Sequence, residues 1–245
     1  MAQQKKVALI TGANRGIGLE TAKQLGETGV TIVAAARTAL AAEETAAKLK
    51  QQGIDAYPLQ LEVTSEADRQ AAAKYLEEKF GKLDILINNA GVAASTGFTN
   101  VTSQVTDDEL ERIFDTNLFA VVALTRELLP LLKKSDSGRI VNLSSILGSL
   151  TLHADPASPI ANFKSFAYDA SKSALNAYSI HLAHELKDTP IKVNSAHPGW
   201  VKTDMGTDAA PMEIPDGAKT SVALALLGAD GPSGRFIHLG QELPW

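Results

Sequence analysis

A tyrosine and a lysine four residues apart, Tyr168 and Lys172 in the stretch FAYDASKSAL, are suited by type and spacing to proton transfer. On a helix this spacing places the phenol and the ammonium on one face, one turn apart. A free phenol has a pKa of about 10 and gives up its proton slowly at neutral pH, whereas a neighbouring positive charge favours the ionised form. Such a pair could exchange a proton with a substrate oxygen.

The same spacing occurs a second time, at Tyr75 and Lys79 in YLEEK, so spacing alone does not identify a reactive pair. This second pair lies in a charged amphipathic segment, where the tyrosine is expected to pack on a sheet and the lysine to be solvated. No serine at a strand end precedes it. Ser145 does end a predicted strand ahead of Tyr168, which favours Tyr168 as the reactive tyrosine.

The elements that would position these side chains alternate between strand and helix. Seven aliphatic or β-branched runs predict strands at 6–10, 31–36, 56–63, 83–89, 139–145, 191–198 and 235–239. Helical patterns cover 16–28, 38–52, 65–80, 107–134, 166–188 and 216–228, with Ser65 and Thr106 as caps. This alternation predicts an α/β fold, a single doubly wound (Rossmann) parallel sheet of seven strands with helices on both faces. Ligands bind such sheets at the carboxyl ends of the strands.

Composition narrows the class of protein. The 245 residues, 44% hydrophobic and 21% charged, predict one globular domain over residues 1–245. A net charge of −5 without a long basic run favours a small-molecule partner over nucleic acid or a membrane surface. The absence of cysteine excludes disulfides, thiol catalysis and Cys-ligated metals. The N-terminus MAQQKKVALITGAN has too few apolar residues for a signal peptide or a membrane span, which predicts a cytoplasmic protein.

Two histidines raise the question of a metal site. His181 and His184 lie three residues apart in HLAHE, beside Glu185. No third ligand is evident, so the preferred interpretation is a helix surface or packing role, and no metal is predicted.

Three glycines directly after the first predicted strand indicate a dinucleotide site. Gly12, Gly16 and Gly18 form the pattern G-x-x-x-G-x-G in TGANRGIGLETAKQL, before an amphipathic helix. Such glycines turn the chain sharply, let the backbone approach a pyrophosphate and let the helix pack closely on the strand. The helix N-terminus then offers N–H groups to the anion. A plain strand-to-helix turn is the alternative, and the flanking strand and helix make it the weaker one.

Two arginines favour NADP(H) as the cofactor. NAD-specific sites usually carry an acidic side chain at the end of the second strand, where it binds the ribose 2′-hydroxyl. Here Arg37 follows that strand in AAARTAL, and Arg15 lies inside the glycine turn. The two guanidinium groups could bind a 2′-phosphate through charge-assisted, bidentate hydrogen bonds. The alternative is that both are solvated surface side chains.

The glycine turn and the Tyr168–Lys172 pair are accompanied by NNAG at 88–91, Ser144 and Ser145, and PGWVKTDM at 198–205. Through these motifs the chain resembles a short-chain dehydrogenase/reductase of the non-extended type. The motifs follow the family's order over nearly the whole chain. The runs TNLFAVVALTRELLPLL, AHPGWVKTDM and LGQELPW are similar to those of the carbonyl reductase branch.

The resemblance implies a role for each matching residue. Tyr168 would be the proton donor, Lys172 would also bind the nicotinamide ribose, and Ser145, three residues before Gly148, would hydrogen-bond the substrate oxygen. Asn117 would hold a water linked to Lys172 through its backbone. Glu62 stands where the family usually has an adenine-binding aspartate. The implied cofactor contacts are Gly12, Asn14, Arg15, Gly16, Ile17, Gly18, Arg37, Glu62, Val63, Asn89, Ala90, Gly91, Tyr168, Lys172, Pro198, Gly199, Val201 and Thr203.

The implied reaction is reduction of a ketone, aldehyde or quinone by NADPH. The substrate wall is expected in residues 92–105, 146–165 and 200–215, with the apolar candidates Leu147, Ile160, Phe163, Trp200 and Met205. An NADP-dependent alcohol dehydrogenase or 3-oxoacyl reductase is one alternative. A non-catalytic NADP(H)-sensing module is another, although it would not need the set of Asn117, Ser145, Tyr168 and Lys172. A monomer, a homodimer and a homotetramer all stay open.

Overall fold

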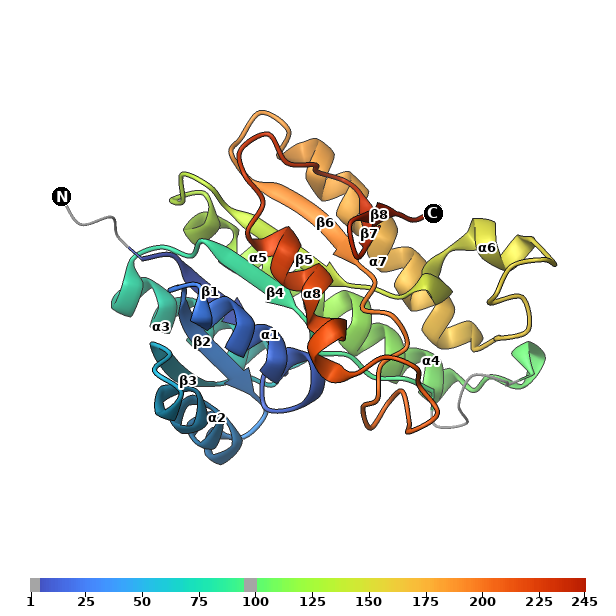
Figure 1. Ribbon diagram of the computed structural model, residues 1–245, viewed down its shortest axis with the longest axis horizontal. Helices are drawn as coiled ribbons and strands as arrows, with labels where there is room; N and C mark the ends of the chain where they lie inside the picture. Colours follow the sequence, from blue (N-terminus) through green and yellow to red (C-terminus); the bar gives the residue numbers. More distant parts are fainter. Residues whose placement is uncertain (1–4, 95–100) are drawn as a thin grey trace.

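A computed structural model describes residues 5–94 and 101–245 of the chain and is built on a central eight-stranded sheet (Figure 1). The strand order is β3-β2-β1-β4-β5-β6-β7-β8. The strands are β1 (Val7–Ile10), β2 (Thr31–Ala36), β3 (Ala56–Gln60), β4 (Ile85–Asn88), β5 (Arg139–Leu143), β6 (Lys192–Ala196), β7 (Phe236–His238) and β8 (Gln241–Glu242). Strand order reverses between β1 and β4, and that switch point is where a ligand is expected to bind.

The predicted doubly wound parallel sheet is confirmed, with one addition. β1 to β7 pair in parallel, and β8 adds an antiparallel edge to β7. The turn between β7 and β8 uses Leu239 and Gly240, both with positive φ (45° and 82°). A strand of two exposed residues carries no hydrophobic alternation, so the sequence pattern could not reveal it.

Helices cover both faces of the sheet. Figure 1 shows α1 and α8 in front of the strands and α5 and α7 behind them. The main helices are α1 (Gly16–Glu27), α2 (Ala39–Gln51), α3 (Glu66–Phe80), α4 (Asp107–Phe114), α5 (Ala120–Leu132), α7 (Phe166–Glu185) and α8 (Ile214–Ala225). No helix within the described ranges combines the length and the apolar character needed to cross a bilayer.

Alternate residues of each strand feed two separate cores. In β1, Ala8 and Ile10 belong to the core that includes Leu25 of α1, while Val7 and Leu9 belong to the core on the opposite face. This period of two, with both sets apolar, is what a parallel sheet buried on both faces requires. The carboxyl ends of the strands are thereby held at fixed positions along one edge.

The region predicted as one helix over 107–134 is divided by a π-helical turn, η2 (Asp115–Phe119), between α4 and α5. The chain stays helical through the π-helical turn, which is why the sequence predicts one continuous helix. The predicted caps are confirmed: Ser65 Oγ accepts from Asp68 N at 3.2 Å and Thr106 Oγ1 from Glu109 N at 3.2 Å.

The segment between β5 and α7, here called the β5–α7 loop (residues 144–165), contains two short elements that the sequence did not indicate. These are a 3₁₀ turn, η3 (Ile146–Gly148), and a helix, α6 (Leu150–Ala154). Thr151 N donates to the Trp245 carbonyl at 2.9 Å, and the Trp245 ring stacks on Phe236 with centroids 5.7 Å apart. The C-terminal residues therefore pack against this loop.

Candidate active site

The carboxyl ends of the strands open into a groove of about 1030 Å³. Of the predicted cofactor contacts, those that line it are Gly12, Asn14, Arg15, Gly16, Ile17, Gly18, Arg37, Glu62, Val63, Asn89, Ala90, Gly91, Tyr168, Lys172, Pro198 and Thr203. Gly199 and Val201 are not among the lining residues. Val201 is buried and bridges to Met212, and Gly199 turns the chain with φ +91° against the Met212 side chain.

The glycine turn has the geometry that a pyrophosphate needs. Gly12 and Gly16 adopt φ of +63° and +53°, which side chains with a Cβ rarely adopt. A Cβ on Gly18 would lie 2.3 Å from the Gly12 carbonyl oxygen, so only glycine allows α1 to start this close to the strand. No side chain caps α1 at its N-terminus, where Arg15 is the N-cap residue. The first N–H groups of the helix are thus available to an anion, and the turn fits a dinucleotide.

Thr11 and Asn89 fix this turn from the neighbouring strand. Asn89 Nδ2 donates to the carbonyl oxygens of Thr11 and Gly12, at 2.8 and 3.1 Å. Thr11 Oγ1 accepts from the backbone N–H groups of Asn89 and Ala90, at 3.0 and 2.9 Å. Thr11 was not singled out from the sequence, although a hydroxyl residue just before the glycine turn was the available signal.

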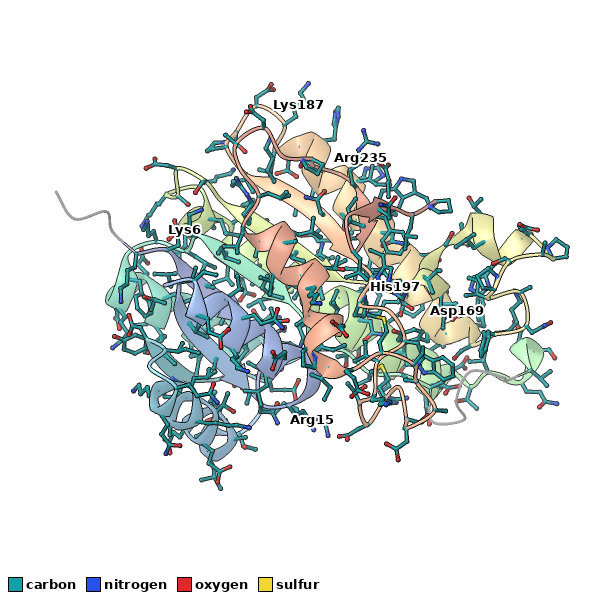
Figure 2. All side chains as sticks on the ribbon, in the orientation of Figure 1. Lys6, Arg15, Asp169, Lys187, His197 and Arg235 are labelled. Atoms are coloured by element: carbon teal, nitrogen blue, oxygen red, sulfur yellow. The ribbon has the colours of Figure 1, made fainter. Side chains whose placement is uncertain are left out.

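The two arginines that the sequence analysis assigns to a 2′-phosphate both line the groove. Arg15 and Arg37 are both exposed, and the Arg15 guanidinium forms an ion pair with Asp204 from the loop after β6 (Figure 2 labels Arg15). Glu62 also lines the groove, but its carboxylate accepts from Thr64 N and Thr64 Oγ1 at 3.2 and 3.1 Å. An adenine contact from Glu62 therefore stays a prediction.

Tyr168 and Lys172 lie on one face at the start of α7, both buried, with the Lys172 Nζ 5.6 Å from the centroid of the tyrosine ring. Lys172 Nζ donates to the Leu143 carbonyl at the end of β5, at 2.7 Å. Ser145 lies close enough to Tyr168 for its hydroxyl to lower the pKa of the phenol. The three groups chosen from the sequence are thus brought together where α7 passes the end of β5.

Gly148 allows η3 to pack directly on the backbone of α7. A Cβ on Gly148 would lie 2.8 Å from the carbonyl carbon and 2.9 Å from the Cβ of Lys172. Ser173 Oγ donates to the Gly148 carbonyl at 2.9 Å. Because Ser145 immediately precedes η3, this close approach fixes the position of its hydroxyl next to Tyr168.

Asn117 lies fully buried in the π-helical turn. Its Oδ1 accepts from Val92 N at 2.9 Å, and its Nδ2 donates to the Val92 carbonyl at 2.9 Å and to Ser171 Oγ at 3.1 Å. A Cβ built on Gly91 would be 3.3 Å from Asn117 Oδ1 and 3.7 Å from Lys172 Nζ, so Asn117 lies next to two residues that line the groove. The π-helical turn thus directs Asn117 at the segment after β4.

Burial dominates the protonation of the two ionisable groups. It raises the pKa of Tyr168 to about 12, against the opposing effect of the Ser145 hydrogen bond, and the charge of Asp169 adds to the rise. Burial lowers the pKa of Lys172 to about 8. In the protein alone, burial therefore outweighs the lowering of the Tyr168 pKa that the sequence analysis expects from Lys172. At neutral pH the phenol carries its proton and Lys172 is mostly charged.

Further residues line the groove that were not chosen as cofactor contacts from the sequence, among them Thr38, Arg112, Thr116, Ser144, Lys202, Asp204, Thr207 and Asp208. Four of them, Lys202, Asp204, Thr207 and Asp208, belong to the segment between β6 and α8, which reaches the groove only in the folded chain. The buried Ser144 hydroxyl has no hydrogen-bond partner within the described part of the chain. His181 and His184 are exposed on α7, away from these lining residues.

Of the apolar candidates for the substrate wall, Met205 lines the groove, whereas Leu147, Ile160, Phe163 and Trp200 are not among its lining residues. Phe163 and Trp200 contact each other edge-on, with centroids 6.4 Å apart. Ile160 is buried. Residues 95–100, within the predicted wall segment 92–105, lie outside the described residues.

The fold is a doubly wound parallel sheet with a glycine turn at its switch point, and Tyr168 and Lys172 line the same groove as that turn. This combination is typical of Rossmann-fold oxidoreductases that use a nicotinamide dinucleotide. The chain belongs to the short-chain dehydrogenase family: the family model described as short chain dehydrogenase matches residues 6–214.

Three known proteins illustrate this likeness. The chain is 33% identical over 241 residues to 3-oxoacyl-(acyl-carrier-protein) reductase FabG of Pseudomonas aeruginosa, covering 98% of this chain and 87% of that protein. The structure of NADPH-bound carbonyl reductase from chicken fatty liver superposes with a TM-score of 0.86 and 29% identity, over 99% of this chain and all (100%) of that one. The structure of salutaridine reductase from Papaver somniferum superposes with a TM-score of 0.82 and 32% identity, over 95% of this chain and 99% of that one.

Proposed function

We propose that the protein is an NADPH-dependent carbonyl reductase that reduces a ketone, aldehyde or quinone, with Tyr168 as the proton donor. The observation that carries this proposal is the buried group of Ser145, Tyr168 and Lys172, in which Ser145 acts on the pKa of the phenol and Lys172 Nζ lies 5.6 Å from its ring. NADPH, when bound, supplies the hydride. The chain supplies the proton, the orientation of the carbonyl and the exclusion of water.

Each of the three side chains has a distinct part in that reaction. Ser145 donates its hydroxyl hydrogen to the carbonyl oxygen and so stabilises the negative charge that develops there. Tyr168, whose buried phenol is protonated at neutral pH, transfers its proton to the same oxygen. Lys172 holds a positive charge near the phenolate that remains and binds the nicotinamide ribose.

The preference for NADPH rests on the adenosine end of the groove. Arg15 and Arg37 both line it, and a 2′-phosphate accepts charge-assisted hydrogen bonds from guanidinium groups. The carbonyl reductase with a TM-score of 0.86 is NADPH-bound, which agrees with this choice.

The pKa of Lys172 predicts how the reaction depends on pH. Burial lowers this pKa to about 8, so the positive charge is present below that pH and is lost as the pH rises through it. We expect kcat/KM for carbonyl reduction to fall above a pH of about 8. In Lys172→Arg, whose guanidinium stays charged, we expect a lower plateau without this alkaline decline. The control Lys79→Arg, in the other Tyr–Lys pair, should keep the profile of the unaltered protein. An unchanged decline in Lys172→Arg would contradict the assignment.

The substrate is expected to be moderately hydrophobic. Phe163 and Trp200 form an exposed aromatic pair, and the Met205 side chain is also partly exposed at the groove. Apolar side chains with a few polar groups are typical of sites for small organic ligands. A polar substrate would gain little from this surface.

A 3-oxoacyl reductase is the second candidate, favoured by the 33% identity to FabG. An NADP-dependent alcohol dehydrogenase and a non-catalytic NADP(H)-sensing module are further alternatives from the sequence. The test is the rate of NADPH and NADH oxidation with a panel of ketones, aldehydes, quinones and 3-oxoacyl thioesters, followed by the reverse reaction with the alcohols. Fastest turnover of ketones, aldehydes or quinones with NADPH is expected. Fastest turnover of thioesters would select the 3-oxoacyl reductase, and no turnover of any compound would overturn catalysis.

The remaining features are proposed on the same basis. Residues 1–245 would form a single catalytic domain that acts on a small molecule in the cytoplasm, without nucleic acid or membrane partners. Light scattering of the purified chain distinguishes a monomer from a homodimer or homotetramer.

A further inference from the structure

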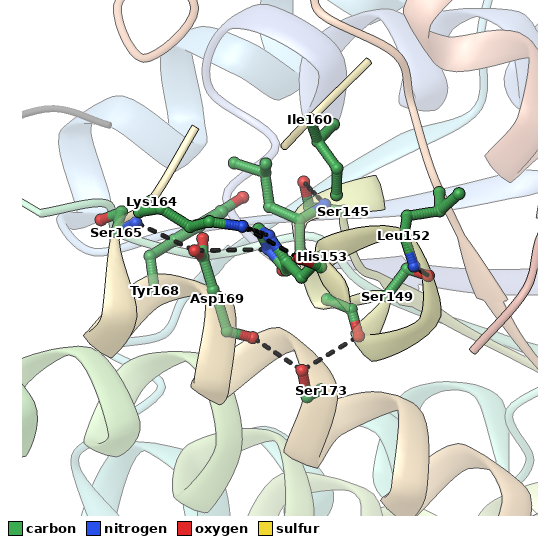
Figure 3. A network of polar contacts seen from close by, with 12 residues as sticks. Ser145, Ser149, Leu152, His153, Ile160, Lys164, Ser165, Tyr168, Asp169 and Ser173 are labelled. Carbon is green, nitrogen blue, oxygen red and sulfur yellow. Dashed lines mark hydrogen bonds and ion pairs between the residues drawn. The ribbon is translucent and has the colours of Figure 1, made fainter. Parts of the chain in front are cut away.

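Three ionisable side chains gather between the β5–α7 loop and α7, next to Tyr168 (Figure 3). Lys164 Nζ lies 2.9 Å from His153 Nδ1 and donates to the His153 carbonyl at 3.3 Å. His153 Nε2 lies 2.9 Å from the Leu147 carbonyl and 3.4 Å from Asp169 Oδ2. None of the three side chains lines the groove. We call His153, Lys164 and Asp169 the loop cluster.

The contacts of the histidine define its protonation. An ammonium group can only donate, so the Lys164 contact makes Nδ1 of His153 the acceptor. Nε2 then carries the single proton and donates to the Leu147 carbonyl. Burial lowers the pKa of His153, which keeps the ring neutral. The ring thus connects a donor from the end of the β5–α7 loop to an acceptor near its start.

The carboxylate of Asp169 completes the connection to α7. Its Oδ2 accepts from Ser165 N at 2.9 Å, while Oδ1 is buried without a hydrogen-bond partner in the described part of the chain. Burial raises the pKa of Asp169 to about 6. Because this value lies above the ordinary 3.8, the charged form is disfavoured, and stability from this group is lost as the pH rises through about 6. At neutral pH the ionisation of Asp169 therefore costs stability, although its Oδ2 keeps its contacts with Ser165 N and His153.

The position of the loop cluster in the chain indicates what it does. The β5–α7 loop starts beside Ser145 and ends just before Tyr168, the two groups that would contact the carbonyl oxygen. The cluster joins Leu147, near one end of that loop, to Ser165 at the other. Ser173 Oγ adds a bond from α7 to the Gly148 carbonyl at 2.9 Å. The loop is thereby closed on the helix close to both groups.

We propose that His153, Lys164 and Asp169 are positioning residues, which fix the β5–α7 loop on α7 and so keep the Ser145 hydroxyl next to Tyr168. This inference rests on the proposed carbonyl reduction for its effect on turnover. The cluster touches neither the substrate nor the cofactor and acts through Ser145.

Three variants test the proposal. Asp169→Ala removes the acceptor for Ser165 N and the partner of His153, whereas Asp169→Asn keeps an acceptor of the same shape without the charge. Asp155→Asn makes the same chemical change elsewhere in the β5–α7 loop, where the carboxylate only caps Ala157 N at 2.9 Å. The measurements are kcat and KM for a ketone, the Kd of NADPH, and hydrogen exchange of residues 144–165.

A positioning role gives a specific pattern. We expect Asp169→Ala to lower kcat by about 10- to 100-fold, because small displacements of reacting groups cost that much. The Kd of NADPH should stay within about twofold, and exchange should rise about tenfold in residues 144–165 but not in β1 or α1. Asp169→Asn should restore most of kcat. It should also be more stable than the unaltered protein at pH 8, a gain that shrinks as the pH falls through about 6.

Other outcomes would overturn the inference. Unchanged exchange in residues 144–165 of Asp169→Ala would show that the cluster does not fix the loop. An equal loss of kcat in Asp155→Asn would show that the effect is not specific to the cluster. Because hydrogen exchange requires no turnover, it still tests the loop cluster if no carbonyl compound is reduced and the proposed function fails.

Discussion

Replacing Tyr168 by phenylalanine is expected to lower kcat by about 1000-fold, within the range that general acids contribute, while the Kd of NADPH changes by less than about twofold. The substitution removes only the hydroxyl, and the buried ring keeps its packing at the start of α7. The carbonyl oxygen then lacks the hydroxyl group that is proposed to give it a proton. Single-turnover oxidation of NADPH measures the chemical step, and a fluorescence titration measures cofactor binding.

The other Tyr–Lys pair offers a matched control. Tyr75 contacts Phe80 edge-on with centroids 6.3 Å apart, and Lys79 Nζ lies 5.9 Å from the Tyr75 ring. The pair of Tyr75 and Lys79 therefore has the same sequence spacing and a comparable contact between lysine and ring, but neither residue lines the groove. Tyr75→Phe should leave kcat unchanged. Turnover of Tyr168→Phe equal to that of Tyr75→Phe would show that Tyr168 is not the acid.

Arg37→Asp is expected to invert the cofactor preference, with the ratio of kcat/KM for NADPH to that for NADH falling by about 100- to 1000-fold. A charge-assisted hydrogen bond contributes about 1.5–3 kcal/mol, and repulsion between the new carboxylate and the 2′-phosphate adds to its loss. The same carboxylate can accept a hydrogen bond from the 2′-hydroxyl of NADH. The ratio is measured with one ketone under identical conditions for both cofactors.

Arg235→Asp is the control for this charge reversal. Arg235 is an exposed arginine that pairs with Glu242 at 3.0 Å, at the β7–β8 edge and outside the groove. Its replacement changes the net charge of the protein by the same amount and should leave the cofactor ratio as it is. A ratio that is equally unaffected in Arg37→Asp would mean that Arg37 does not bind the 2′-phosphate.

The sequence predicted those parts of the site that depend on local geometry. Gly12, Gly16 and Gly18 lie within a span of seven residues just after β1 and form one turn, so their spacing indicates the turn that the structure contains. Tyr168 and Lys172 share a helix face because of the helical period. The parallel order of β1 to β7 follows from alternating strands and helices, since parallel neighbours need a crossover.

Features that depend on tertiary packing could not be predicted in this way. The π-helical turn that directs Asn117 at Val92 lies inside a segment that the sequence predicts as one helix. The upward shift of the Tyr168 pKa arises from burial, which a sequence does not quantify. The loop cluster joins His153, Lys164 and Asp169, whose spacings match no periodic element, and only the fold of the β5–α7 loop brings them together.

A crystal structure of the protein with NADPH tests the central claim most directly. It should show the nicotinamide in the groove and the Tyr168 hydroxyl facing it, within about 3 Å of the Ser145 hydroxyl, with Lys172 at the nicotinamide ribose. A Tyr168 hydroxyl turned away from the nicotinamide, or a nicotinamide bound outside the groove, would contradict the assignment of this site to carbonyl reduction.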